Sequence, residues 1–439
     1  MKTAFAAAFS LAVAASPVFA GDWPMFRGPE RNDISTESGL LKQWSTPPKQ
    51  LWVINTAGLG YSGFSVVRGT LYTQGARGAE QGAKEGGKEY LIAIDANTGK
   101  EKWAAEIGDK LPNGWGDGPR ATPSVDEDRV YAMGGKGNLI CASATDGKIL
   151  WTASMTEMGG SVPGWGYTES PLVDGANVMC TPGGNQGTMV ALDKMTGAKV
   201  WQSAEWTDKA QYASIIPADI AGNRQYIQLT MQSIAGVEAK SGKLMWKMAF
   251  PGKTAVIPTP IYKDGHVYVA AGYGVGCMNI DVSSGNSASQ TYENNVMVNH
   301  HGGVILVGDY LYGFSDKGGW TCQDWKTGEA KWQVKGAPAP RRGAPAPEPA
   351  APSAAPVGLG KGAVHCADGM LYLLGEDGGT VVMIEASPEG WKEHGRFTLT
   401  PQTAQRSPKG KIWTHPVVSN GKLYLRDQEY VYCYDVRGS

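Results

Sequence analysis

Six titratable side chains lie just before short apolar segments that recur along the chain, where a ligand could meet them. They are Arg120, Glu169, His300, His301, Lys361 and His415, with Ser214 and Thr259 as uncharged members of the same series. An arginine and a lysine can bind an anionic group, and a glutamate with a histidine can act as acid and base. We therefore predict a site for an anionic ligand, with Glu169, His300, His301 and His415 as candidate catalytic residues.

Two tryptophans accompany this series. Trp115 and Trp165 each lie between two glycines, a few residues before Arg120 and Glu169 respectively. An indole face can stack on a flat ligand or on a sugar ring. Arg120, Trp115, Trp165 and Lys361 are therefore the candidate ligand-binding residues.

A structural role for the same residues is the competing interpretation. Polar side chains in a water-filled channel satisfy solvent and backbone groups, and Arg120 and Glu169 could form a salt bridge between neighbouring units. His300 and His301 are adjacent, so on a regular strand they would point to opposite faces. Adjacent histidines do not readily chelate one ion, and no standard carboxylate–histidine spacing occurs. We therefore predict no metal site.

An internal repeat must position these side chains. Its strongest copies approach A-x-D-x-x-T-G-x-x-x-W, and consecutive copies recur at intervals of roughly 45–50 residues. The copies end at Trp103, Trp151, Trp201, Trp246 and Trp332, with one degenerate copy before the last. The residue pair that ends in glycine supplies a chain reversal, and the tryptophan can fill the wedge between neighbouring sheets. This period is typical of a four-stranded propeller blade.

Eight hairpins precede the repeat motifs along the chain. They lie near Ser65, Pro123, Pro171, Ser214, Pro260, Gly303, Ala363 and Pro416. The last unit ends near Arg437 without a closing tryptophan strand, whereas residues 49–54 supply such a strand before the first hairpin. An N-terminal strand that completes the last blade would close the ring and remove free sheet edges. The sequence thus predicts an all-β, eight-bladed β-propeller, with seven blades as the alternative.

The chain divides into a leader, an extension and one domain. Residues 1–20 have the positive start, apolar run and small-residue cleavage site of a signal peptide, with no lipid-accepting cysteine and no length to span a bilayer. Residues 21–48 form an N-terminal extension, and 49–439 the propeller. Segments 74–89 and 337–356 are predicted flexible insertions, with partner docking as the alternative. We expect a periplasmic or secreted protein.

Composition narrows the possible partners. The net charge is −1 and no basic run occurs, so nucleic acid is not an expected partner. The six cysteines lie in apolar strand segments, three of them at one register of the repeat, which favours buried thiols over a disulfide framework. A closed ring has no free edge that demands a mate, so we expect a monomer.

The repeat units resemble the pyrroloquinoline-quinone (PQQ) type repeat of quinoprotein alcohol dehydrogenases and of the BamB family. The segments D-W-P-M-F-R-G-P from Asp22, G-P-R-A-T-P from Gly118, G-Y-T-E-S-P from Gly166, N-H-H-G-G from Asn299 and Y-L-R-D-Q from Tyr424 look similar to exported PQQ-like repeat proteins. The resemblance implies the propeller fold over nearly all of residues 22–437, and makes PQQ with calcium a possible cofactor. The paired cysteines of many quinoprotein dehydrogenases do not occur, and the resemblance assigns their calcium-binding and catalytic residues to no specific positions of this chain.

Three functional hypotheses follow, and whether the protein is an enzyme stays open among them. The first is an exported scaffold that binds a small-molecule ligand or a protein partner, because the repeat occupies the whole domain. The second is a PQQ-dependent alcohol or sugar dehydrogenase, which the repeat type implies. The third is a hydrolase or lyase that uses the arginine, glutamate and histidine side chains at the channel mouth.

Overall fold

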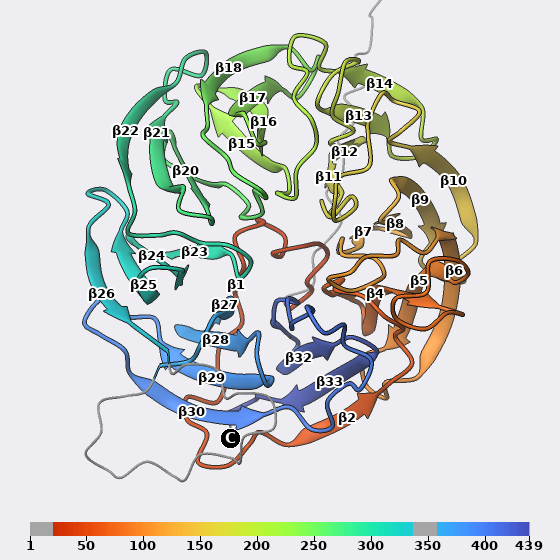
Figure 1. Ribbon diagram of the computed structural model, residues 1–439, viewed down its shortest axis with the longest axis vertical. Helices are drawn as coiled ribbons and strands as arrows, with labels where there is room; N and C mark the ends of the chain where they lie inside the picture. Colours follow the sequence, from red (N-terminus) through yellow and green to blue (C-terminus); the bar gives the residue numbers. More distant parts are fainter. Residues whose placement is uncertain (1–20, 337–357, 439) are drawn as a thin grey trace, which may run out of the picture.

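Eight antiparallel sheets surround a central channel, as Figure 1 shows. The computed structural model describes residues 21–336 and 358–438, and within these ranges the chain has no α-helix. No element in the described part is therefore a helix that could cross a membrane. The predicted signal peptide and the predicted insertion 337–356 lie outside the described residues. The all-β, eight-bladed prediction is confirmed.

Seven blades have four strands and one, blade 7, has a fifth, and in blades 1–7 the innermost strand comes first in sequence. The first four blades consist of β3 (Ser65–Val67), β4 (Thr70–Arg77), β5 (Lys88–Asp95) and β6 (Glu101–Asp109); β7 (Ser124–Asp126), β8 (Arg129–Met133), β9 (Asn138–Ser143) and β10 (Ile149–Ser154); β11 (Leu172–Asp174), β12 (Asn177–Cys180), β13 (Val190–Asp193) and β14 (Lys199–Gln202); and β15 (Ile216–Ile220), β16 (Asn223–Leu229), β17 (Ser233–Glu238) and β18 (Leu244–Ala249).

The second half of the ring follows the same plan. Its blades consist of β19 (Ile261–Lys263), β20 (His266–Ala271), β21 (Gly276–Asp281) and β22 (Ser289–Asn294); β23 (Val304–Val307), β24 (Tyr310–Ser315), β25 (Gly319–Asp324) and β26 (Ala330–Val334); β27 (Gly362–Ala367), β28 (Met370–Gly375), β29 (Thr380–Glu385) and β30 (Glu393–Thr398); and β31 (Val417–Ser419), β32 (Lys422–Asp427), β33 (Tyr430–Asp435) and β2 (Gln50–Ile54).

The N-terminal strand β2 closes the ring, as predicted. It pairs antiparallel with β33 as the outermost strand of the last blade, with Trp52 opposite Cys433. Trp52 therefore takes the place of the closing tryptophan that the last unit lacks. Because the sheet now has four strands, blade 8 can pack on blade 1 as the other blades pack on their neighbours.

Tryptophans at the ends of the repeat motifs join each blade to the next. The indole of Trp103 donates to the carbonyl of Ala144 in the next blade, and its ring lies against Gly147. A Cβ at Gly147 would lie 2.5 Å from that ring, so only glycine allows this close approach. Four further tryptophans donate to the next blade in the same way: Trp52, Trp151, Trp201 and Trp332. Trp246 differs and bonds Gln225 within its own blade.

The acidic residue of the repeat forms the tight turn before that glycine. Oδ1 of Asp95 accepts hydrogen bonds from the backbone N–H groups of Asn97 and Thr98 and from the Thr98 hydroxyl. These donors lower the pKa of Asp95 against the opposing effect of its partial burial. The D-x-x-T-G motif is thus explained by local hydrogen bonding.

All six cysteines are buried and unpaired, so the prediction of buried thiols is confirmed. Cys141, Cys322 and Cys433 lie opposite Tyr131, Tyr312 and Tyr424 in three different blades. The shared register places each thiol in a separate sheet, far from a partner for a disulfide.

The N-terminal extension runs across the centre of the ring instead of lying outside the propeller (Figure 1). Trp23 pairs with Val66 beside the innermost strand of blade 1. The chain then forms β1 (Ile34–Ser35), which pairs parallel with β27 and makes blade 7 five-stranded. The extension therefore belongs to the propeller core, which repeat analysis did not predict.

The insertion in blade 1 is shorter than the predicted segment 74–89. Strands β4 and β5 extend through residues 77 and 88, so the connecting loop spans residues 78–87. Lys110 and Asp117 hold this loop through a buried ion pair of 2.6 Å. Nζ of Lys110 also donates to the carbonyls of Glu80 and Ala83, and Oδ2 of Asp117 accepts from Gly82 N. The loop is thereby tied to the segment that carries Trp115.

Candidate functional site

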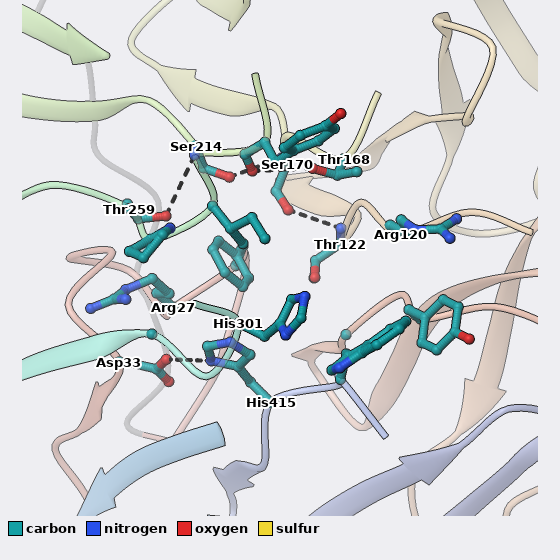
Figure 2. Close-up of a pocket in the computed structure, with 18 of the residues that line it drawn as sticks. Arg27, Asp33, Arg120, Thr122, Thr168, Ser170, Ser214, Thr259, His301 and His415 are labelled. Atoms are coloured by element: carbon teal, nitrogen blue, oxygen red, sulfur yellow. Dashed lines mark hydrogen bonds and ion pairs between the residues drawn. The ribbon is translucent and has the colours of Figure 1, made fainter. Parts of the chain in front are cut away.

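A cavity of about 200 Å³ lies at one mouth of the central channel, where loops before the innermost strands meet the N-terminal extension (Figure 2). Nine aromatic residues line it: Trp23, Phe26, Tyr61, Phe64, Trp115, Trp165, Tyr212, Tyr273 and Trp413. The polar and charged lining consists of Arg27, Asp33, Arg120, Thr122, Thr168, Ser170, Ser214, Thr259, His300, His301 and His415. The cavity thus combines aromatic walls with a small set of polar groups, as ligand sites do.

Six of the eight predicted site residues reach this cavity. They are Arg120, Trp115, Trp165, His300, His301 and His415. Ser214 and Thr259, the uncharged members of the predicted series, also line it. Glu169 and Lys361 lie outside the lining. The repeat register therefore predicted which loops converge at one channel mouth but not the direction of every side chain.

Glu169 points into the protein instead of the cavity. Its carboxyl group accepts hydrogen bonds from the backbone and hydroxyl of Thr181, at 2.6 and 3.0 Å, and from Gln228. Burial raises the pKa of Glu169 to about 8, against the opposing effect of these donors and of the nearby Arg31. No ion pair joins Arg120 to Glu169 in the described part of the chain, so the salt bridge considered as the structural alternative does not form.

Lys361 acts behind the cavity wall. Its Nζ lies 2.6 Å from Oδ1 of Asp316 and donates to Nδ1 of His300 at 2.9 Å. Burial, followed by the charges of His301 and Lys361, holds the pKa of His300 well below its usual value. Burial therefore keeps His300 a neutral imidazole, and Lys361 donates to it from outside the cavity lining.

His300 and His301 both face the cavity, contrary to the alternation expected of a strand. Their rings stack with centroids 3.6 Å apart. The two residues precede β23 in an irregular segment, which Asn299 holds by donating to the carbonyls of Gly303 and Phe314. Strand alternation does not apply to such a segment, and the stacked pair forms part of one wall.

An unbroken row of rings extends from this pair. The ring centroid of Trp413 lies 4.9 Å from that of His301, and the ring centroid of Tyr61 lies 5.0 Å from that of Trp413. The guanidinium of Arg120 lies over the Tyr61 ring at 5.0 Å and donates to the carbonyls of Gly116 and Gly118. Figure 2 shows this guanidinium directed away from His301 and His415. Arg120 therefore supports the aromatic wall and lies at the edge of the cavity.

Trp115 and Trp165 provide the more open aromatic faces. The Trp115 side chain is 43% exposed, and Lys409 lies 5.7 Å from its ring centroid. Trp165 contacts Tyr212 edge-on at 5.6 Å. An indole held by backbone contacts and still exposed to solvent can receive the face of a ring without prior movement.

A row of hydroxyl groups connects neighbouring blades along the opposite side. Ser170 Oγ accepts from Thr122 N, Ser214 Oγ from Ser170 N, and Thr259 Oγ1 from Ser214 N, as the dashed lines in Figure 2 show. Each hydroxyl uses one lone pair in this way and keeps its own proton for a different acceptor. The row supplies hydrogen-bonding groups to the same cavity that the aromatic residues line.

The N-terminal extension contributes buried charges to the cavity. Arg27 donates from Nη2 to the carbonyl of Val304 at 2.8 Å, and burial lowers its pKa. Arg31 donates to the carbonyl of Ser170 at 2.7 Å from outside the lining. These bonds attach the extension to blades 6 and 3 on opposite sides of the channel.

Asp33 lies between two histidines from different blades. Its Oδ1 lies 2.9 Å from Nδ1 of His365, and its Oδ2 lies 3.1 Å from Nδ1 of His415. Burial alone would raise the pKa of Asp33, but the hydrogen bonds from His365 and His415 outweigh it, and the charges of His415 and Arg27 lower the pKa further. Asp33 is therefore ionised, and His415 is held at the cavity by a carboxylate.

Comparison with known proteins agrees with this architecture. A family model described as outer membrane protein assembly factor BamB matches residues 87–334, which is more than half of the chain. The chain belongs to this BamB family of PQQ-like propellers.

Solved structures of other proteins share this BamB-family fold. BamB from Moraxella catarrhalis aligns with a TM-score of 0.58 and 15% identity, over 90% of this chain and 99% of that one. Quinohemoprotein alcohol dehydrogenase from Comamonas testosteroni aligns with a TM-score of 0.64 and 13% identity, over 97% and 82% of the two chains. These low identities show the common fold alone. No curated protein matches the sequence.

The residues of this BamB-family cavity do not fit a calcium-bound quinone. Calcium takes six to eight oxygen ligands, with carboxylates prominent among them. Asp33 is the sole carboxylate among the described lining residues, and both of its oxygens accept from histidines. The described residues contain no cluster of three or more histidine, cysteine or acidic side chains suited to a metal.

Sequence reasoning missed Trp23, Phe26, Arg27 and Asp33 of this BamB-family site. The extension has no repeat period, so the register argument did not apply to it. The one available signal was the D-W-P-M-F-R-G-P segment from Asp22, where aromatic and charged residues gather outside the repeats. Trp413 was missed because it lies in the long loop before β31, outside the strand register.

Proposed function

We propose that the protein is an exported propeller that binds a small ring-bearing molecule, such as a monosaccharide, in the channel-mouth cavity. The observation that carries this proposal is the convergence of Trp115, Trp165 and Trp413 with a row of hydroxyl groups around one cavity. A sugar ring presents an apolar C–H face and a polar rim. Aromatic faces and hydroxyl donors that line the same cavity match both parts.

The size of the cavity favours a single ring. Its volume of about 200 Å³ lies below the roughly 300–1,000 Å³ of pockets that hold drug-sized ligands. Its charged groups also favour a neutral ligand over a polyanion. Arg27 and Arg120 both donate to backbone carbonyls, and Lys361 lies outside the lining. A compact, hydroxyl-rich ring fits these constraints better than a flat polycarboxylate does.

Export is part of the proposal, on the strength of residues 1–20. The expected mature chain begins at Gly21, which is followed at once by the segment that crosses the channel. Expression with the leader and N-terminal sequencing of the product tests the cleavage site. A product that starts at Gly21 and appears outside the cytoplasm is the expected result, and uncleaved cytoplasmic protein would contradict export.

A thermal-shift screen of the mature protein tests the binding function. The screen uses glucose, galactose, mannose, N-acetylglucosamine and glucuronate, with PQQ plus calcium as a separate arm. We expect at least one monosaccharide to raise Tm in a saturable manner, and Trp165→Ala to reduce the shift. Stabilisation by stoichiometric PQQ with calcium, and by none of the sugars, would instead favour the dehydrogenase hypothesis.

A protein partner is the second candidate, because exposed apolar side chains occur on the outer strands. Ile149 and Leu150 of β10 and Val200 of β14 are 40–51% exposed on neighbouring blades. The double variant Leu150→Ser with Val200→Ser should leave sugar binding intact. If it abolishes a cellular function that Trp165→Ala spares, the scaffold role is the principal one.

A further inference from the structure

One imidazole in the cavity is oriented by a buried carboxylate. The backbone N–H of Val418 donates to Nε2 of His365 at 3.3 Å, so His365 carries its proton on Nδ1 and donates to Asp33. The ionised Asp33 can only accept, so it also accepts a hydrogen bond from the Nδ1–H of His415 at 3.1 Å. These contacts fix the tautomer of His415 and leave a lone pair on its Nε2.

The Nε2 of His415 is available to a bound molecule. The side chain of His415 lines the cavity and is 14% exposed, and its Nε2 has no hydrogen-bond partner within the described chain. The ring of Phe26 packs edge-on against the ring of His415, with the two ring centroids 5.6 Å apart. A Cβ on Gly303 would lie 2.9 Å from Cε1 of His415, so the glycine leaves room for this ring position.

We propose that His415 is a general base that activates water for hydrolysis of a carboxylic ester on a ring-bearing molecule, with Asp33 as its positioning residue. This proposal rests on the proposed binding function and adds a reaction to it. Water loses a proton to Nε2 of His415 while its oxygen bonds to the acyl carbon. The bond from that carbon to the alcohol oxygen then breaks, and Nε2 returns the proton to the leaving oxygen. The products are a carboxylic acid and an alcohol.

The described lining favours an ester over other hydrolysable bonds. Glycosidic hydrolysis generally needs two carboxyl groups that flank the bond, whereas Asp33 is the sole carboxylate of the described lining and is held by two histidines. Ester hydrolysis needs one base and a donor for the developing oxyanion. The hydroxyl of Thr122 points into the space beside His301 and can supply such a donor (Figure 2).

Release of 4-nitrophenolate from 4-nitrophenyl acetate by the mature protein tests the proposed activity. We expect saturable hydrolysis in the wild type and a loss of kcat by about 10²- to 10⁴-fold in His415→Ala. Added imidazole should restore part of the lost rate, because it can replace the missing ring. His394→Ala, on the outer strand β30, removes a histidine outside the cavity and should leave the rate unchanged.

Asp33→Asn tests the positioning role. If the side-chain oxygen of the introduced asparagine keeps the bond to His365, its amide nitrogen faces Nδ1 of His415, which must then accept and carry its proton on Nε2. We expect kcat to fall on the order of 10²- to 10⁴-fold while KM changes less than about threefold. A purely structural role would change stability and KM without this selective effect on kcat.

The outcomes separate the two proposals. Saturable sugar binding without ester hydrolysis above background overturns the catalytic proposal and leaves the binding function intact. Hydrolysis that His415→Ala retains at the wild-type rate also overturns the catalytic proposal. Ester hydrolysis without sugar binding would overturn the monosaccharide assignment instead. If Asp33→Asn fails to fold, His415→Ala with imidazole rescue still decides the matter.

Discussion

Nδ1 of His415 donates to Oδ2 of Asp33 across 3.1 Å, although 382 positions separate these residues in the sequence. Asp33 belongs to the N-terminal extension, and His415 lies just before the innermost strand of the last blade. The extension that supplies Asp33 continues into β2, which closes blade 8. Closure of the ring and completion of the cavity thus depend on one segment of chain.

Lys110→Met is expected to destabilise the protein and disturb Trp115. The variant leaves Asp117 buried without its cation, at a cost of about 3–5 kcal/mol in the free energy of unfolding. Asp117 also accepts from Asn113 N, whose side chain accepts from Trp115 N, so the aromatic face loses its support. Chemical denaturation measures the effect.

Lys392→Met is the matched control for that variant. Lys392 pairs with Glu389 at the surface, where water screens the attraction, so the pair contributes little to stability. If Lys110→Met lowers the free energy of unfolding no more than Lys392→Met does, the loop 78–87 is not held by the buried ion pair.

Glu169→Gln should flatten the pH dependence of stability between pH 5 and 8. The pKa of Glu169 is raised to about 8 in the folded protein, so its contribution is complete below the unfolded pKa near 4.5 and is lost as pH rises through 8. Ionisation in the unfolded state favours unfolding over this range by about 2–4 kcal/mol. Denaturation at pH 5 and pH 8 measures the slope, and equal slopes in both proteins would contradict the assignment.

Gly147→Ala tests the contact between blades. A new Cβ would lie 2.5 Å from the Trp103 ring, and φ of +75° adds backbone strain. Gly175→Ala carries the strain alone, because nothing lies within 4 Å of its Cβ position and its φ is +59°. We expect Gly147→Ala to lower the free energy of unfolding by about 1–3 kcal/mol more than Gly175→Ala does. Equal losses of Tm would mean that the tryptophan–glycine contact does not hold the blades together.

The repeated part of the fold could be predicted from the sequence because its signals are local and periodic. The D-x-x-T-G turn depends on hydrogen bonds within four residues, as at Asp95, and the tryptophan spacing gives the size of a blade. The last repeat unit lacks its closing strand, and the segment that contains Trp52 was the one candidate to supply it. The same register placed Arg120 and His415 at one channel mouth.

The rest of the site depends on contacts that have no period. A register accurate to one or two residues locates a loop but not the direction of its side chains, so Glu169 was placed in the cavity although it faces Thr181. The stacked pair His300 and His301 needs an irregular backbone that alternation does not describe. Asp33 enters the channel through long-range pairing of β1 with β27, for which the sequence offers no local signal.

The central claim is that the channel-mouth cavity binds a ring-bearing molecule against its indole faces, including the exposed face of Trp115. Its most direct test is calorimetric titration of wild-type protein and Trp115→Ala with the monosaccharide that gives the largest thermal shift. We predict one site per chain in the wild type and a Kd about tenfold weaker in the variant, since loss of one stacking face costs about 1–1.5 kcal/mol. Saturable binding with the same Kd in both proteins, or no saturable binding to the wild type, would contradict the claim.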